Sequence, residues 1–376
     1  MSESRFRRSI PLRGIAASLG HAFRSPDATD RTMRIFAAAS LAPVVLILLG
    51  IWFGGLWALA ALVFITGIVA TLDHLSPRAA PHLPGAADLP AADRLSVAIA
   101  LVHLALLPVV LWAVSGDSGL SAGARLAIFL AAGLWVGQVS NANAHELIHR
   151  RARGLYRLGV AVYVSLLFGH HASSHRLIHH RHVASDNDPN SAQRGESFYA
   201  FLPRAWIGSF VAGYEMEKGL RARLSRPSLN PYLWYVGGGV SMLVVVTWLF
   251  GFGGLIVYLA LCAHAQIQLL LSDYVQHYGL SRARRPDGKL EPVGPQHSWD
   301  APHWLSSAMM LNAPRHADHH AHPGRAYPAL DLMTGAPRLP YALPVMGAIA
   351  LVPQVWFRLM DPRLPPPPNA RRRPAF

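Results

Sequence analysis

The chain has 376 residues, of which 52% are hydrophobic and only 14% charged, and its formal net charge is +14. Long apolar runs carry the hydrophobicity, so a membrane protein is the first class to consider. The basic residues are scattered arginines beside these runs. We expect them to set orientation and to attract anionic lipid or an acidic partner, and we expect no nucleic-acid partner.

Six apolar stretches approach the roughly 20 residues that a spanning helix needs. Short glycine-containing breaks divide the first pair and the last pair, so each pair is predicted to form a tight helical hairpin. We therefore expect an all-α protein with one membrane domain over 35–360, after a basic segment 1–34 and before a disordered, Pro- and Arg-rich tail 361–376. The predicted spans are about 35–53, 55–72, 95–115, 124–143, 233–250 and 253–272.

The arginines predict the orientation of these spans. Seven of them precede the first span, which favours a cytoplasmic N-terminus. The connections near 54, 116–123 and 252 then fall outside the cytoplasm, and none contains Lys or Arg. We expect a multi-pass protein of a bacterial-type inner membrane, with both termini and the long segments 144–232 and 273–376 in the cytoplasm. The first apolar run resembles a span rather than a cleavable signal.

Three further apolar segments are too short or too broken to be predicted as spans. Segments 155–168 and 198–214 are expected to be interfacial or re-entrant helices, and 343–357 is interrupted by two prolines. The single cysteine, Cys262, excludes an internal disulfide and a four-cysteine electron carrier within the chain. Any electrons that the protein uses must therefore come from another protein.

Histidine is the most informative residue type, with 20 copies, of which eight fall between His145 and His182 and four between His316 and His322. A spacing of i, i+4 places two imidazoles on one helix face. In the HxxxHH and HxxHH clusters, a second histidine directly follows a ligand histidine, and this adjacent imidazole can reach a second ion. Nine imidazoles on the cytoplasmic side suit two metal ions. They are His145, His149, His175, His179, His180, His277, His316, His319 and His320.

Other histidines receive plainer interpretations. Five isolated ones are expected to be ordinary core or surface residues, namely His21, His74, His82, His297 and His303. Four that flank the clusters are either outer groups of the site or exposed, namely His170, His171, His182 and His322. The segment His145–His149 also matches the HExxH motif of zinc proteases, but that alternative leaves the other clusters unexplained. Glu146 is instead predicted to orient a ligand imidazole.

Polar residues also occur inside the predicted spans. His264, Gln268 and Ser272 follow one another at i, i+4 and form a stripe that leads towards His277. Polar groups at membrane depth face a bundle interior or a cavity. The stripe therefore lines the inner end of a substrate channel or ties helices together by hydrogen bonds. His103, in the third span, has no visible partner in the sequence.

Several motifs resemble the integral-membrane alkane monooxygenase family, within the desaturase and hydroxylase superfamily. Asp273-Tyr-Val-Gln-His-Tyr-Gly-Leu280 is similar to its NYxEHYGL, and Arg315-His-Ala-Asp-His-His-Ala-His-Pro323 to its RHSDHHAHP. Val183-Ala-Ser-Asp-Asn-Asp-Pro189 and Gly195-Glu-Ser-Phe-Tyr199 resemble its VATPEDP and GESxY. The likeness covers roughly 95–335. Ser174 and Gln276 depart from it, because the family has Glu at both places.

This resemblance implies a six-helix protein in which the nine histidines hold two irons on a cytoplasmic cap. It implies hydroxylation of the terminal methyl of an alkane to a primary alcohol, with O2 and with electrons from rubredoxin and rubredoxin reductase. Glu146, Asp318 and Gln276 are expected to support the ligands. One alternative is a fatty-acyl desaturase or acyl hydroxylase on the same scaffold. A metal transporter is disfavoured, because transporters place their ligands near the bilayer midplane.

Overall fold

The computed structural model describes residues 26–76, 78–85 and 89–366. His21, most of the basic segment 1–34 and residues 367–376 of the predicted tail lie outside the described residues. The described part is helical, with three isolated β-bridges and no named strand, as the sequence predicted.

Five helical stretches in the described part are long and apolar enough to cross a membrane, so the chain is a membrane protein. The first is α2 (Pro26–Phe53), and the third is α5 (Pro90–Ser115). The second joins α3 (Gly55–Val63), η1 (Phe64–Ile68) and α4 (Val69–Leu75). The fourth joins α6 (Ala122–Trp135), η2 (Val136–Ser140) and α7 (Asn141–Ile148), and the fifth is α12 (Tyr232–His277).

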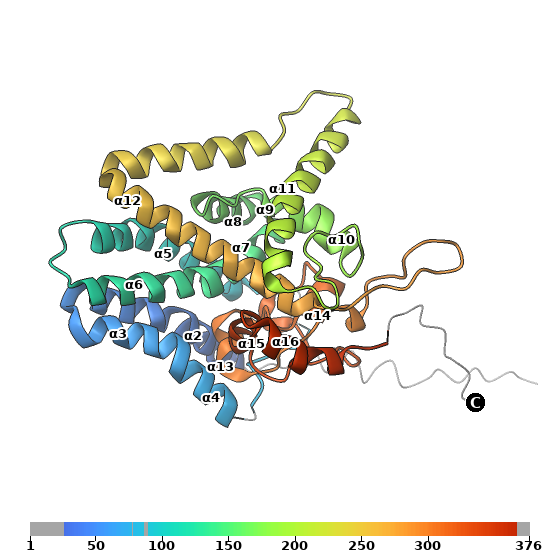
Figure 1. Ribbon diagram of the computed structural model, residues 1–376, viewed down its shortest axis with the longest axis horizontal. Helices are drawn as coiled ribbons and strands as arrows, with labels where there is room; N and C mark the ends of the chain where they lie inside the picture. Colours follow the sequence, from blue (N-terminus) through green and yellow to red (C-terminus); the bar gives the residue numbers. More distant parts are fainter. Residues whose placement is uncertain (1–25, 77, 86–88, 367–376) are drawn as a thin grey trace, which may run out of the picture.

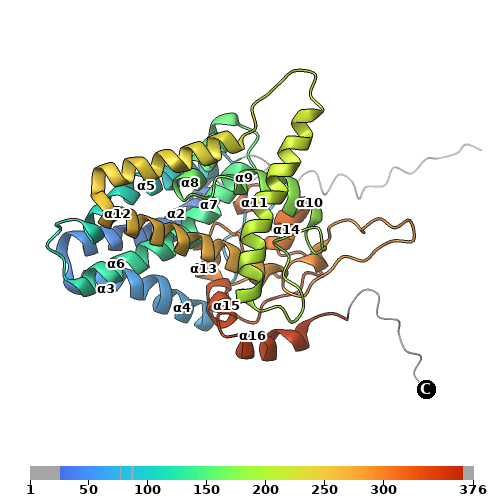
Figure 2. The same ribbon diagram turned by 45° about the horizontal axis from the view of Figure 1, so that its top comes forward.

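The structure has five candidate spans rather than the predicted six because α12 combines two of the predicted spans in one element. This element of 46 residues contains both of the last two predicted spans, and its backbone is non-helical at Gly251, where φ is 66° and ψ is −168°. Glycine tolerates positive φ without steric cost, so the chain reverses sharply there. Figures 1 and 2 show α12 as two arms that diverge from this bend. The turn between α2 and α3 is made in the same way by Gly54, at φ 61°.

The turns and the histidine-bearing segments lie at opposite ends of the helical bundle. The α2–α3 turn, the α5–α6 connection and the bend of α12 gather at the left in Figures 1 and 2. The short helices that carry most of the clustered histidines lie away from that end. They are η3 (His175–His179), α10 (His180–His182) and α14 (His316–Ala321), and α9 (His171–Ser174) directly precedes η3.

The remaining helices cover the bundle and are not candidate spans. The two segments predicted to be interfacial form α8 (Arg153–Ser165) and α11 (Phe198–Ala222), and the proline-interrupted segment forms α15 (Leu343–Ala350) and α16 (Pro353–Met360). The other short elements are α13 (Trp304–Met309), η4 (Pro295–His297), η5 (Tyr327–Ala329) and η6 (Asp361–Arg363).

Buried polar contacts fix the helices that carry the site. Trp135 is fully buried, and its indole N–H donates to the carbonyl of Ser40 in α2 at 2.8 Å. His103 of α5, which lacked a partner in the sequence, lies between the hydroxyls of Ser140 at 2.8 Å and Ser165 at 2.9 Å. The first bond joins α6 to α2, and the other two join α5 to η2 and α8. A buried polar group is costly unless it is paired in this way.

We expect Trp135→Ala to lower the free energy of unfolding by about 3–5 kcal/mol, because it opens a cavity and removes the indole hydrogen bond to the Ser40 carbonyl. Trp52→Ala is the matched control, since Trp52 is 83% exposed. Scanning calorimetry of the purified protein in detergent measures both. Equal unfolding midpoints for the two variants would contradict the packing described here.

Candidate metal centre

Nine histidines form two groups in which the ring nitrogens converge. Within each group, the candidate ligand nitrogens all lie within 4.8 Å of one another. These are the nine imidazoles that the sequence singled out, and they come from the end of α7, from η3 and α10, from the end of α12 and from α14. The five-histidine group is His145, His149, His175, His180 and His319, and the four-histidine group is His179, His277, His316 and His320.

The five-histidine group is arranged around His175. Its Nε2 lies 2.7 Å from Nε2 of His145 and 2.9 Å from Nε2 of His180. Nε2 of His319 is 3.1 Å from Nε2 of His180, and Nε2 of His149 is buried without a hydrogen-bond partner in the described part of the chain. Lone pairs that face one another at these distances are stabilised by a cation between them.

The four-histidine group has the same character. Nε2 of His316 lies 3.0 Å from Nε2 of His277 and 3.1 Å from Nε2 of His320. Nδ1 of His277 donates to the carbonyl of His297 at 3.2 Å, which leaves the lone pair of its Nε2 directed into the group. Nε2 of His179 is buried and has no partner among the described residues.

Most of the cluster imidazoles lie in surroundings that keep them neutral. Burial lowers the pKa of each of these histidines well below its usual value, and neighbouring imidazoles lower it further. A neutral imidazole has the free lone pair that a metal requires. The histidines outside the spans with such a lowered pKa are His149, His175, His180, His316, His319 and His320.

His179 differs because a buried carboxylate holds it. Oδ2 of Asp188 accepts from Nδ1 of His179 at 2.8 Å and from the hydroxyl of Ser191 at 2.7 Å. Burial is the largest single influence and lowers the pKa of His179, but the charge and hydrogen bond of Asp188 and the charge of Asp273 together raise this pKa above its usual value. This bond directs Nε2 into the four-histidine group, as in carboxylate–histidine–metal arrangements. Sequence reasoning assigned Asp188 no role, although the residue lies in a quoted motif nine positions after His179.

The predicted supporting residues make other contacts. Glu146 accepts from Arg150 at 2.6 Å and from the backbone N–H of Tyr327 at 3.0 Å, and the structure shows no hydrogen bond from it to a described histidine. Asp318 pairs with His322 at 2.7 Å and with Arg325 at 2.5 Å. Both carboxylates therefore anchor the backbone around the clusters. Neither arrangement resembles the free general base of a zinc protease.

The two departures from the family pattern have local explanations. Nε2 of Gln276 donates to the carbonyl of Ala313 at 3.3 Å, which an ionised carboxylate cannot do, and its Oε1 accepts from Ser272 at 2.8 Å. Ser174 packs against Gly213 of α11, where even a Cβ on the glycine would come within 3.1 Å of the Ser174 Cβ. A small residue therefore suits position 174.

The histidines outside the two groups divide into satisfied residues and neighbours of the site. His297 is paired through both ring nitrogens, with Glu291 at 3.0 Å and with the N–H of Gly294 at 2.9 Å. His171 is buried beside His175, with the ring centroids 4.9 Å apart. His297 therefore fits its plain interpretation, whereas His171 lies against the site.

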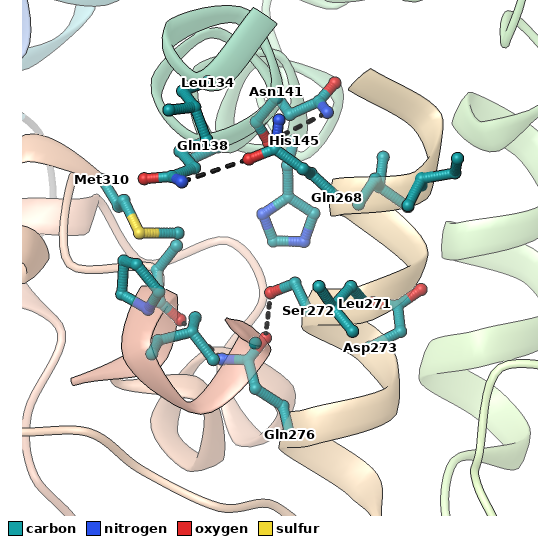
Figure 3. Close-up of a pocket in the computed structure, with 18 of the residues that line it drawn as sticks. Leu134, Gln138, Asn141, His145, Gln268, Leu271, Ser272, Asp273, Gln276 and Met310 are labelled. Atoms are coloured by element: carbon teal, nitrogen blue, oxygen red, sulfur yellow. Dashed lines mark hydrogen bonds between the residues drawn. The ribbon is translucent and has the colours of Figure 1, made fainter. Parts of the chain in front are cut away.

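An apolar cavity of about 280 Å³ reaches the two histidine groups from the membrane-spanning helices. His145 and His175 of the five-histidine group and His316 of the four-histidine group line its inner end. Figure 3 shows the imidazole of His145 projecting into this cavity between Gln268 and Ser272 of α12. Its remaining walls come mainly from apolar residues of α6, α12 and α15, among them Leu134, Leu269 and Leu343, and from Met310 and Leu351, which directly follow α13 and α15.

The polar stripe of the sixth predicted span lies on this cavity. His264, Gln268 and Ser272 all line it, as does Gln276 one turn further on. Gln268 also ties helices together, because its Nε2 donates to the carbonyl of Gly133 at 2.9 Å and its Oε1 accepts from Gln138 at 3.1 Å. Gln268 therefore lies on the cavity and also ties helices together by hydrogen bonds.

The donor set fits a pair of transition-metal ions. All the convergent atoms are imidazole nitrogens, which suit iron, zinc, copper and nickel and do not suit magnesium or calcium. The unpartnered, buried Nε2 atoms of His149 and His179 point to one ion in each group.

Comparison with known proteins agrees with this site. A family model described as fatty acid desaturase matches residues 121–350. Alkane 1-monooxygenase 2 of Pseudomonas aeruginosa is 28% identical over 82% of this chain and 84% of that protein. An alkane 1-monooxygenase of Pseudomonas putida is 34% identical over 70% of this chain and 66% of that protein. The hydroxylase component of a xylene/toluene monooxygenase of Pseudomonas putida is 27% identical over 83% and 84%.

The matched region contains all nine clustered histidines and the cavity residues of α6, α12 and α15. It also covers more than half of the chain. This protein therefore belongs to the fatty acid desaturase family, and within it the chain is similar to the alkane monooxygenases.

Proposed function

We propose that this protein is a non-haem di-iron monooxygenase that hydroxylates the terminal methyl of an alkane or a related hydrocarbon to a primary alcohol. The observation that carries the proposal is that His145, His175 and His316 of the two groups line an apolar cavity among the membrane-spanning helices. Apolar substrate reaches such a site from the bilayer. Relatives named for alkane, xylene and toluene oxidation support a substrate that bears a methyl group.

The nine histidines would hold two iron ions, one in each group. An unactivated C–H bond offers no acidic proton and no leaving group, so protein side chains alone do not cleave it. Iron bound there would supply the activation of dioxygen. The overall reaction breaks one methyl C–H bond and forms one C–O bond. The second oxygen atom leaves as water, with two protons and two electrons from outside the substrate.

The protein itself excludes water from the cavity and holds the ligand imidazoles in place. The leucines of α6, α12 and α15 exclude water from the cavity, and Asp188 fixes the imidazole of His179. With Cys262 as its single cysteine, the chain has no cysteine-ligated electron carrier of its own. We propose that rubredoxin, reduced by its reductase, donates the electrons on the cytoplasmic side.

We further propose that the two arms of α12 each cross the membrane, which gives six spans in a membrane domain over 35–360. The turns at Gly54, in the α5–α6 connection and at Gly251 would then face away from the cytoplasm. The histidine groups and both termini would face the cytoplasm. The gathering of the three turns at one end of the bundle supports this arrangement.

Cysteine accessibility tests the orientation. In a Cys262→Ala background, Asp117→Cys should react with a membrane-impermeant maleimide on spheroplasts, because exposed Asp117 follows α5 on the outer side. Lys289→Cys, which is also exposed, should react only after lysis. The reverse pattern would invert the proposed topology.

Asp188→Asn tests the support of the four-histidine group. The amide removes the charge that stabilises and orients His179, so we expect iron affinity at this group to fall about 10- to 100-fold. The matched control is Asp186→Asn, because Asp186 is exposed two residues away. Iron per chain, measured by mass spectrometry after dialysis against a weak chelator, should drop by about half only in Asp188→Asn. Equal iron in both variants would remove Asp188 from the site.

A substrate panel tests the reaction. Cells that express the protein with rubredoxin and its reductase should convert some n-alkanes to primary alcohols, detected by gas chromatography. His316→Ala should abolish the products, because His316 contacts both His277 and His320. His74→Ala, at an exposed histidine outside the site, should retain them. Products that persist in His316→Ala would refute the metal assignment.

The alternative function is a fatty-acyl desaturase or acyl hydroxylase, which the description of the matched family favours. It predicts no alcohol from any alkane and a changed pattern of unsaturation or hydroxylation in the lipids of the host. The same cultures distinguish the two functions by fatty-acid analysis.

A further inference from the structure

A second cavity lies at the end of the second candidate span, and it shares no lining residue with the cavity at the histidine groups. Its volume is about 810 Å³, within the roughly 300–1,000 Å³ of ligand sites. Its walls come from α4 and the segment after it, from Pro302 and His303 before α13, and from the segment that leads into α15. Figures 1 and 2 show α4, α13 and α15 beside one another at this place. The cavity therefore lies where a spanning helix ends.

Two arginines give this second cavity a positive charge. Arg78 follows α4 and Arg338 precedes α15, and both line the cavity. Both residues are exposed, and neither side chain makes an ion pair or a hydrogen bond within the described part of the chain. His303 and Tyr341 line the cavity as well. A cavity lined by charges of one sign concentrates ions of the opposite sign, so this one favours an anion.

Of the described acidic residues, only Asp73 lines the second cavity, and the protein already uses its carboxylate. Asp73 is buried, and its oxygens accept from the backbone N–H of Leu305 at 2.6 Å and of Ser306 at 3.1 Å. These N–H groups belong to the first turn of α13 and have no partner within that helix. The carboxylate therefore holds α13, and it pairs with neither arginine among the described residues. The two arginines leave the cavity with an excess of positive charge.

The α4 wall of the second cavity continues onto an apolar face of the spanning helix. Leu75 lines the cavity and is 72% exposed. Leu72 and Ile68, on the preceding turns of the same helix face, are 39% and 42% exposed. A free phosphate ion would leave this apolar row without contacts. A ligand that combines an anionic head with an acyl chain would cover the row and neutralise the arginines together.

We propose that the second cavity binds an anionic phospholipid, with its phosphate held by Arg78 and Arg338 and an acyl chain along the exposed row of α4. Guanidinium groups form strong, charge-assisted hydrogen bonds with phosphate oxygens. Basic pockets between spanning helices on the cytoplasmic side are known to take such head groups. The site is independent of the proposed reaction, because none of its residues lies in either histidine group.

The segment that carries Arg78 also holds the chain beside a ligand histidine. The carbonyl of Ala80 accepts from Nη2 of Arg315 at 2.7 Å, and the carbonyl of Pro81 accepts from Nδ2 of Asn312 at 3.0 Å. Arg315 directly precedes His316, the first residue of α14. A phosphate that restrains Arg78 would therefore restrain this support of α14.

The segment that carries Arg338 reaches the same helix by another route. Its neighbours pair with the backbone of Asp300, because the N–H of Leu339 donates to the Asp300 carbonyl at 2.8 Å. Oδ1 of Asp300 in turn accepts from the N–H of Ala317 at 2.8 Å, in the first turn of α14. The bound lipid would thus join two segments that both support α14.

The test measures lipid binding to the full chain, purified in a neutral detergent and freed of lipid, by native mass spectrometry. We expect phosphatidylglycerol to bind more tightly than phosphatidylcholine with the same acyl chains. An arginine near an anionic lipid contributes about fivefold in affinity, so Arg78→Gln with Arg338→Gln should weaken phosphatidylglycerol binding about 25-fold. Both arginines are exposed, so the double variant should fold and keep the unfolding midpoint of the lipid-free wild type.

The matched control is Arg223→Gln with Arg226→Gln. These arginines are exposed and lie outside the second cavity, and their replacement removes the same charge. The control should bind phosphatidylglycerol like the wild type. Added phosphatidylglycerol should also raise the unfolding midpoint of the wild type and of the control, but not that of the cavity variant.

Each outcome decides for or against the lipid site. Loss of binding only in the cavity variant, with a preference for phosphatidylglycerol in the wild type, would establish it. Equal binding of the two lipids by the wild type, or an equal loss in both double variants, would overturn it. Displacement of phosphatidylglycerol by millimolar inorganic phosphate would assign the arginines to a free anion and overturn the lipid. None of these results requires iron or substrate, so failure of the monooxygenase proposal would be seen separately.

Discussion

The structure depends on one constraint: it must hold nine buried imidazoles with their ring nitrogens facing one another. Protonation would place like charges a few ångströms apart, and burial already lowers the pKa of most of these groups. The lone pairs of neutral imidazoles still repel one another unless a cation lies between them. The protein therefore has to bring the ends of α7 and α12 together with α14 and η3, and the long helical stretches fix two of these four segments.

The sequence predicts which histidines gather but does not divide them between two ions. That division depends on a π-helical turn at η3, which places His175 opposite His180, five residues on, at 2.9 Å. His179 then faces the other group. A regular α-helix would pair His175 with His179 instead. In contrast, α14 is a regular α-helix, so His316 contacts His320, four residues on. His319 points to the five-histidine group instead. The spacing of histidines in a sequence does not show whether the helical turn that carries them is an α-turn or a π-turn.

The spans and the clustered histidines were predictable because each has a periodic or compositional signal. The partners of single polar residues were not, because they come from distant parts of the chain. Ser140 and Ser165 satisfy His103 from two other helices, and Tyr327 reaches Glu146 across 181 positions. The near neighbour Asp188 was also missed, since one aspartate in a loop resembles any turn residue until the fold shows that it is buried.

Polar side chains also lie inside the helical bundle, and their contacts show how the structure accommodates them. His103 and Gln266 point into protein and form hydrogen bonds there. Gln138 and His264 lie on the apolar cavity, and Oε1 of Gln138, like Oε1 of Gln266, has no partner among the described residues. Gly133 and Gly137 leave room on the facing helix for the side chains of His264 and Gln268. Because an unpaired buried polar group is costly, it is these hydrogen bonds between helices, together with small residues opposite them, that allow polar side chains to lie beside an apolar cavity.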